Sequence, residues 1–99
     1  MKIIVRKKAD EDLDHIFDRI AKSNPRAAAN VIRRIRARIG KLETPGLARM
    51  GRPGLDAGTR ELVEPPYIIV YEVHDAQGEV HILYIAHGAQ DRESGNFQP

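Results

Sequence analysis

The sequence predicts an α+β fold in which a helical hairpin packs on one face of a curved, mainly antiparallel sheet, in the chain order β-α-α-β-β-β. Two observations predict this fold class: apolar residues repeat with helical spacing in the first half of the chain and alternate as in strands in the second. At 99 residues, 41% hydrophobic and 30% charged, the chain has the size and composition of one domain. We expect that domain over residues 1–92 and a polar tail over residues 93–99.

Both helices are predicted from apolar residues that share one face. Ile3-Ile4-Val5 comes first as a short strand at or near a sheet edge. The first helix is expected from Asp10 to Ser23, where Leu13, Ile16, Phe17 and Ile20 repeat at i, i+3, i+4 and i+7. Asn24-Pro25 then combines a capping side chain with a proline at the first helical position. The second helix should end before Thr44, which makes the pair an antiparallel hairpin.

The second half of the chain predicts a loop and three strands. Residues 44–58 are rich in Gly and Pro and indicate a loop, with one possible turn of helix near residues 47–50. Strands are expected over Arg60–Val63, Tyr67–His74 and Val80–His87. Pro65-Pro66 should break the chain between the first two, and residues 75–78 should form the turn before the last.

Charge is divided unevenly between the two halves. Residues 1–54 hold 14 basic and 6 acidic side chains (+8), and residues 55–99 hold 2 basic and 8 acidic ones (−6), which sum to the net charge of +2. Much of the positive charge lies on the second predicted helix, as Arg33, Arg34, Arg36, Arg38 and Lys41. A basic helix face either stays solvated or binds an acidic partner, which could be a protein or a nucleic acid.

Composition excludes several classes of site and location. Without cysteine the chain forms no disulfide and no Cys-ligated metal site. No apolar run reaches the roughly 18 residues of a membrane span, and the apolar stretch near Met1 is too short for a signal peptide, so we expect a cytoplasmic protein that does not contact membranes. His74 and His81 could face each other across a hairpin, but a third metal ligand is missing. We therefore expect no metal and no cofactor.

One pair of residues could serve phosphate cleavage. Arg60 begins a predicted strand and His87 ends another, and both could lie on the sheet surface. An arginine stabilises the charge of a phosphoryl transition state, and a histidine transfers protons. The alternative for His87 is a structural histidine that bonds a neighbouring carbonyl or carboxylate. Tyr67, Tyr71 and Tyr84 alternate with aliphatic residues, which favours packing over the stacking of nucleic-acid bases.

Six short segments carry a resemblance to a known family: Ala9-Asp10-Glu11-Asp12-Leu13-Asp14-His15-Ile16, Asn24-Pro25-Arg26-Ala27-Ala28, Met50-Gly51-Arg52-Pro53, Arg60-Glu61-Leu62-Val63, Pro66-Tyr67-Ile68-Ile69-Val70-Tyr71 and His87-Gly88-Ala89-Gln90-Asp91. As an ordered set over about residues 3–92, they resemble the RelE/ParE superfamily of toxins from type II toxin–antitoxin systems. The resemblance implies the fold deduced above.

The superfamily divides into two activities. RelE-like members are ribosome-dependent mRNA endonucleases, whereas ParE-like members inhibit DNA gyrase without known enzymatic chemistry of their own. The Arg-rich second helix, the Gly-Arg-Pro segment and the His-Gly-Ala-x-Asp ending look more like ParE. Ile68 stands where an arginine is more common, and no tyrosine follows Tyr84, which weakens the nuclease interpretation.

The resemblance therefore implies a ParE-like toxin that acts by binding gyrase and is neutralised by a ParD-like antitoxin in a hetero-oligomer, with nucleic acid reached only through partners. The alternatives are a RelE-like endonuclease that uses Arg60 and His87, or a protein that has lost toxicity and only binds antitoxin. Two sets of contact residues are expected. The antitoxin set is Leu13, Ile16, Arg33, Arg34, Arg36, Arg38, Tyr67 and Tyr71, and the target set is Arg60, His87, Asp91 and Arg92.

Overall fold

The computed structural model describes residues 1–88 and contains a five-stranded sheet in the order β1-β5-β4-β3-β2. The strands are β1 (Lys2–Val5), β2 (Arg52–Pro53), β3 (Arg60–Glu64), β4 (Tyr67–His74) and β5 (Glu79–His87). β1 pairs with β5 in parallel, and the other neighbouring strands are antiparallel. The predicted fold class is confirmed, with β1 at one edge of the sheet.

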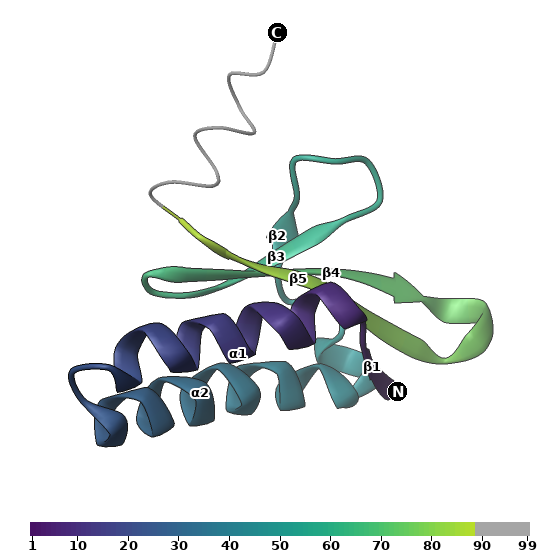
Figure 1. Cartoon of the computed structure of the whole chain (residues 1–99). Helices are drawn as coiled ribbons and strands as arrows, with labels where there is room; N and C mark the ends of the chain where they lie inside the picture. Colours follow the sequence, from purple (N-terminus) through teal and green to yellow (C-terminus); the bar gives the residue numbers. More distant parts are fainter. Residues whose placement is uncertain (89–99) are drawn as a thin grey trace, which may run out of the picture.

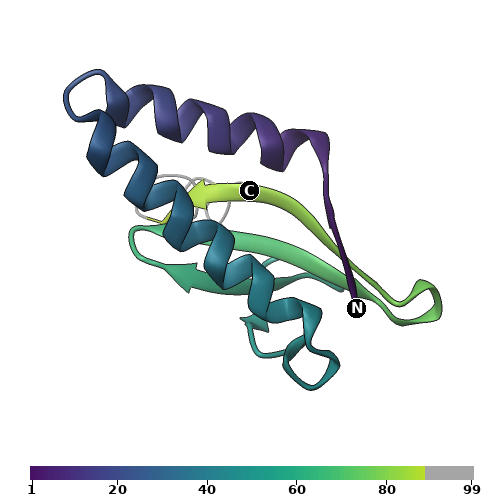
Figure 2. The same cartoon turned by 90° about the horizontal axis from the view of Figure 1, so that it is seen from below.

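Two helices, α1 (Lys7–Ala21) and α2 (Pro25–Gly40), form an antiparallel hairpin that covers one face of the sheet (Figures 1 and 2). α1 packs against β5, and α2 reaches β3. Asn24 caps α2, because its side-chain oxygen accepts a hydrogen bond from the backbone N–H of Ala27 at 3.0 Å. This cap, followed by Pro25, confirms the helix start that the sequence indicates.

Three local expectations differ from the structure. α1 begins at Lys7 rather than Asp10, because the sheet fixes where the chain leaves β1: the N–H of Arg6 bonds the carbonyl of Ile82, and the carbonyl of Arg6 already accepts from Asp10. The helical turn in the loop is a 3-10 turn over Pro45–Leu47, earlier than expected. Finally, β2 has only two residues, too few to produce an alternation in the sequence.

β4 is buried on both faces, which explains why its sequence is almost wholly apolar. The side facing the helices carries Tyr67, Ile69 and Tyr71, which join Leu13 and Ile35 in the main core. On the other side Ile68 and Val70 pack with Ala86, and with the partly buried Val63, Leu83 and Tyr84. No helix within residues 1–88 combines the length and the apolar character that crossing a bilayer requires.

Candidate interaction surface

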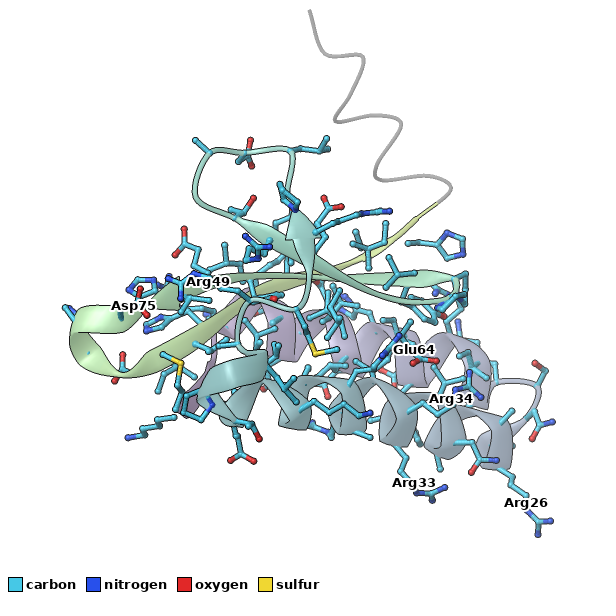
Figure 3. The ribbon with its side chains drawn as sticks, turned by 180° about the vertical axis from the view of Figure 1, so that it is seen from behind. Arg26, Arg33, Arg34, Arg49, Glu64 and Asp75 are labelled. Atoms are coloured by element: carbon cyan, nitrogen blue, oxygen red, sulfur yellow. The ribbon has the colours of Figure 1, made fainter. Side chains whose placement is uncertain are left out.

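The outer face of α2 is a strongly basic surface. The helix contains five arginines and no acidic residue. Arg26, Arg33 and Arg36 are exposed, and Figure 3 shows Arg26 and Arg33 pointing from the helix into solvent. Arg33 donates to the neutral side chain of Asn30, three residues earlier, at 2.7 Å, and has no ion pair with any carboxylate of residues 1–88. We call Arg26, Arg33 and Arg36 the basic face of α2.

Arg34 and Arg38 differ from these three because both are tied to the sheet. Glu64, at the end of β3, lies 3.5 Å from Nε of Arg34 and 3.3 Å from Nε of Arg38. Arg38 also donates to the backbone carbonyl of Val63 at 2.9 Å. Their charges are therefore partly compensated, and Arg38 holds α2 against β3. Of the four arginines expected to contact a partner, Arg33 and Arg36 are the ones available without breaking an ion pair.

The four apolar and aromatic residues expected to contact the partner lie in the core instead. Leu13, Ile16, Tyr67 and Tyr71 have exposed fractions of 2%, 5%, 5% and 0%. The reason is that the helices cover the sheet face to which all four belong. In contrast to these four, Phe17 of α1 is a large apolar residue whose side chain is 38% exposed. The folded chain therefore presents little of these four side chains to a partner, and their role as antitoxin contacts stays a prediction.

Arg60 and His87 do not form the pair that phosphate cleavage would need. Arg60 on β3 pairs with Tyr71 of β4, and His87 on β5 pairs with Tyr67 of β4. Arg60 and His87 therefore lie on the two strands that flank β4, about 13 Å apart along it. Nε of Arg60 donates to the backbone carbonyl of Gly51 at 3.0 Å, which gives this arginine a structural bond. Asp91 and Arg92, the other expected target contacts, lie outside the described residues.

A small pocket at the end of the sheet brings together residues that the sequence analysis did not group. Its volume is about 180 Å³, and it lies between α1 and the strand ends at which β4 begins and β5 stops. His15 and Arg19 line it from α1, and Tyr67 and His87 line it from the sheet, with their rings edge to face at 5.7 Å. Polar residues at helical spacing beside the apolar stripe of α1 were the signal available in the sequence.

Asp12 lies at the same pocket and fixes α1 to the sheet. One of its carboxylate oxygens accepts the backbone N–H of Ile85 at 2.9 Å, and the other accepts from the ammonium group of Lys8. Asp12 is only 8% exposed, so these two donors compensate a nearly buried charge. The Asp12 side chain is therefore an anchor between α1 and β5.

The loop before β3 is held by a buried tyrosine and a surface ion pair. Gly51 donates its N–H to the hydroxyl of Tyr71 at 3.0 Å. Farther out, Arg49 forms an ion pair with Asp75 in the turn between β4 and β5, and Figure 3 shows the two side chains side by side. Hydrogen bonds from Arg49, aided by its positive charge, lower the pKa of Asp75 from its ordinary value. Asp75 in turn raises the pKa of Arg49.

This ion pair leads to a prediction about acid conditions. Because the pKa of Asp75 is lowered on folding, the pair contributes stability above the ordinary aspartate pKa of about 3.9, and the contribution disappears as the pH falls through the folded pKa. Replacing Arg49 by glutamine should return the pKa of Asp75 toward its ordinary value. Carbon-detected NMR titration of the Asp75 carboxyl measures this change, and an unchanged pKa in Arg49→Gln would contradict it.

The expected contact between His74 and His81 is confirmed. Their rings stack with centroids 4.1 Å apart, and each bonds a glutamate two residues earlier, Glu72 for His74 and Glu79 for His81. Arg6 adds a hydrogen bond to the second ring nitrogen of His81 at 2.9 Å. No cluster of three or more metal-binding side chains occurs within residues 1–88.

Comparison with known proteins decides the family. Residues 3–92 match the family model described as the ParE toxin of the type II toxin–antitoxin system parDE. The chain belongs to the ParE toxin family. It is 42% identical over 81 residues to the toxin candidate Y4kP of Sinorhizobium fredii, which covers 79% of this chain and 78% of that protein.

Solved structures agree with the ParE assignment. A chain of the chromosomal ParDE toxin–antitoxin system of P. aeruginosa superimposes with a TM-score of 0.77 and 28% identity, over 88% of this chain and 95% of that one. A chain of the RelBE2 toxin–antitoxin complex of Mycobacterium tuberculosis gives 0.57 and 26%, over 87% and 88%. The resemblance to the RelE/ParE superfamily is thereby confirmed, and the protein is the toxin of a type II toxin–antitoxin system.

Proposed function

We propose that this ParE-family toxin inhibits DNA gyrase in the cytoplasm and arrests growth until a cognate ParD-like antitoxin binds and neutralises it. Membership of the parDE family over residues 3–92 is the observation that carries the proposal. The similarity to a chain of the P. aeruginosa ParDE system supports the antitoxin partner. The toxin acts by binding, and it reaches nucleic acid through its partners.

The basic face of α2 is the proposed contact for the antitoxin. Arg26, Arg33 and Arg36 present three exposed positive charges on a helix that has no acidic residue. A segment rich in Asp and Glu that lies along α2 would pair with these charges, and long-range attraction would speed its association. The buried residues Leu13, Ile16, Tyr67 and Tyr71 take no part in this version of the interface.

The RelE-like alternative receives little support from the site geometry. Arg60 and His87, its two proposed catalytic residues, lie on different strands and open on different pockets. General acid–base catalysis needs its groups within hydrogen-bond reach of one reacting centre. We therefore keep gyrase as the proposed target.

The test of the proposal is expression of the toxin without antitoxin, followed by two assays side by side. Purified gyrase should lose supercoiling activity and accumulate cleaved DNA, while mRNA in a coupled translation reaction should stay intact. Cut mRNA with normal gyrase would overturn the proposal in favour of endonuclease activity. Normal growth with neither effect would show that this toxin is inactive against both targets.

Reversing charge on the basic face should weaken the antitoxin complex. In the double variant Arg33→Glu, Arg36→Glu we expect affinity for the cognate antitoxin to fall at least about tenfold at low salt, and less at high salt, because the lost attraction is screened. Titration calorimetry at two salt concentrations measures both effects.

The matched control makes the same charge change on two elements other than α2. Lys2→Glu, Lys7→Glu alters exposed residues at β1 and at the start of α1, so its affinity should stay within about twofold of the parent. Equal losses in both double variants would mean that only the net charge matters. An unchanged affinity in the α2 variant would remove this helix from the interface.

A further inference from the structure

The pocket between α1 and the end of the sheet is a different site from the basic face of α2. We propose that it binds one carboxylate side chain of a peptide segment, with Arg19 as the main donor. This proposal depends on the proposed function in one respect: the antitoxin is the protein that supplies the peptide segment.

Arg19 and Tyr67 offer hydrogen-bond donors to the pocket. The guanidinium of Arg19 donates to the hydroxyl of Tyr67 at 3.3 Å, which leaves Arg19 further N–H groups and leaves the tyrosine its own proton to donate. His15 is exposed and forms no hydrogen bond with any other residue from 1 to 88. A planar carboxylate fits the fork of a guanidinium, and the charge-assisted bonds between them are the strong ones.

Asp12 does not oppose such a ligand, although it lines the same pocket. Its two carboxylate oxygens already accept from the N–H of Ile85 and from Lys8, and Lys8 compensates its charge. Among residues 1–88 no carboxylate forms an ion pair with Arg19, so the pocket is left with its positive charge. Ile16 and Ile85 also line the pocket, and their apolar side chains suit the methylene groups of an acidic side chain.

The volume of the pocket limits the ligand to a single side chain. The volume of about 180 Å³ is below the range of roughly 300–1,000 Å³ that is typical of pockets for drug-sized molecules and cofactors. A nucleotide would not enter, whereas the end of a glutamate or aspartate side chain would.

The charges around the pocket favour a peptide over a nucleic acid. Glu11, Asp14 and Asp18 are exposed on α1, the helix that lines the pocket. A nucleic-acid backbone carries a negative charge on every nucleotide and would be repelled by these carboxylates. A peptide can instead place one acidic residue in the pocket and basic residues on either side, where they meet the acidic side chains of α1. The segment we infer is thus one acidic residue with basic neighbours, opposite in charge to the segment that would fit α2.

The test uses the full toxin and three capped five-residue peptides with lysine at both ends. The central residue is glutamate, glutamine or phosphoserine. Binding is followed by NMR of the ¹⁵N-labelled protein, through the Ile85 amide and the Arg19 side-chain Nε–H. We expect the glutamate peptide to bind about tenfold more tightly than the glutamine peptide, because a charged hydrogen bond is exchanged for a neutral one.

Two variants and one control locate the effect. Arg19→Gln should abolish the preference for glutamate, and Tyr67→Phe, which keeps the ring against His87, should reduce it about threefold. Arg33→Gln removes an exposed arginine of α2 and should keep the full preference. The amide spectrum of each variant reports whether it is folded.

Equal binding of the glutamate and glutamine peptides would overturn the proposal, as would tighter binding of the phosphoserine peptide. A preference that persists in Arg19→Gln would also overturn it. The experiment contains neither gyrase nor antitoxin, so its failure leaves the proposed function intact. Failure of the gyrase assay, in turn, leaves the peptide preference unchanged.

Discussion

Replacing Gly51 by alanine should lower the free energy of unfolding by about 3 kcal/mol, the upper part of the range for overpacking a buried site. A Cβ atom at this position would lie 2.5 Å from the backbone carbonyl oxygen of Glu61 and 2.8 Å from the hydroxyl of Tyr71. The first of these atoms belongs to β3 and cannot move without disturbing the sheet. The second accepts the N–H of Gly51, so moving it breaks that bond.

Gly46 is the matched control in the same loop. A Cβ added there meets no atom within 4 Å, so Gly46→Ala should change stability by less than about 0.5 kcal/mol. Urea unfolding followed by circular dichroism measures both variants. If Gly51→Ala were as stable as Gly46→Ala, the close approach of the loop to β3 would be wrong.

Truncating Leu13 to alanine should lower the free energy of unfolding by about 3 kcal/mol, because a fully buried leucine leaves a cavity when it is shortened. Leu13 is 2% exposed in the main core between α1 and the sheet. For a domain of this size the total stability is about 5–15 kcal/mol, so the loss is a large fraction of it.

Phe17 is the comparison for Leu13 on the same helix. With 38% exposure, Phe17→Ala should cost less than about 1.5 kcal/mol. The pair also tests whether Leu13 contacts the antitoxin: because Leu13 is buried, antitoxin affinity measured on folded Leu13→Ala should equal that of the parent. A folded Leu13→Ala variant with weakened affinity would restore Leu13 as a contact residue.

Much of the fold could be predicted because its signals are local. The Asn24 cap, the proline after it and the run of β-branched and aromatic residues from Tyr67 to His74 each identify an element from a few neighbouring residues. The start of α1 could not be predicted in this way. It depends on the bond between Arg6 and Ile82, which are far apart in the sequence.

The candidate site was harder to predict for a related reason. Helical spacing places Leu13, Ile16 and Phe17 on one stripe, but only the packed sheet decides that the first two are buried and the third is exposed. In the same way, five arginines on α2 look alike in the sequence. Glu64 on β3 forms ion pairs with Arg34 and Arg38. The other three, Arg26, Arg33 and Arg36, are exposed to a partner. The ion pairs cannot be read from the sequence.

The parallel pairing of β1 with β5 has a consequence for the order in which the toxin is synthesised. Residues 2–5 leave the ribosome well before their strand partners, which are residues 79–82. Asp12 likewise waits for Ile85. A nascent chain therefore carries an unpaired β1 and an unanchored first helix until β5 has been synthesised, and contacts of such long sequence separation close slowly. The toxin can complete its sheet and anchor its first helix only after β5 has been synthesised.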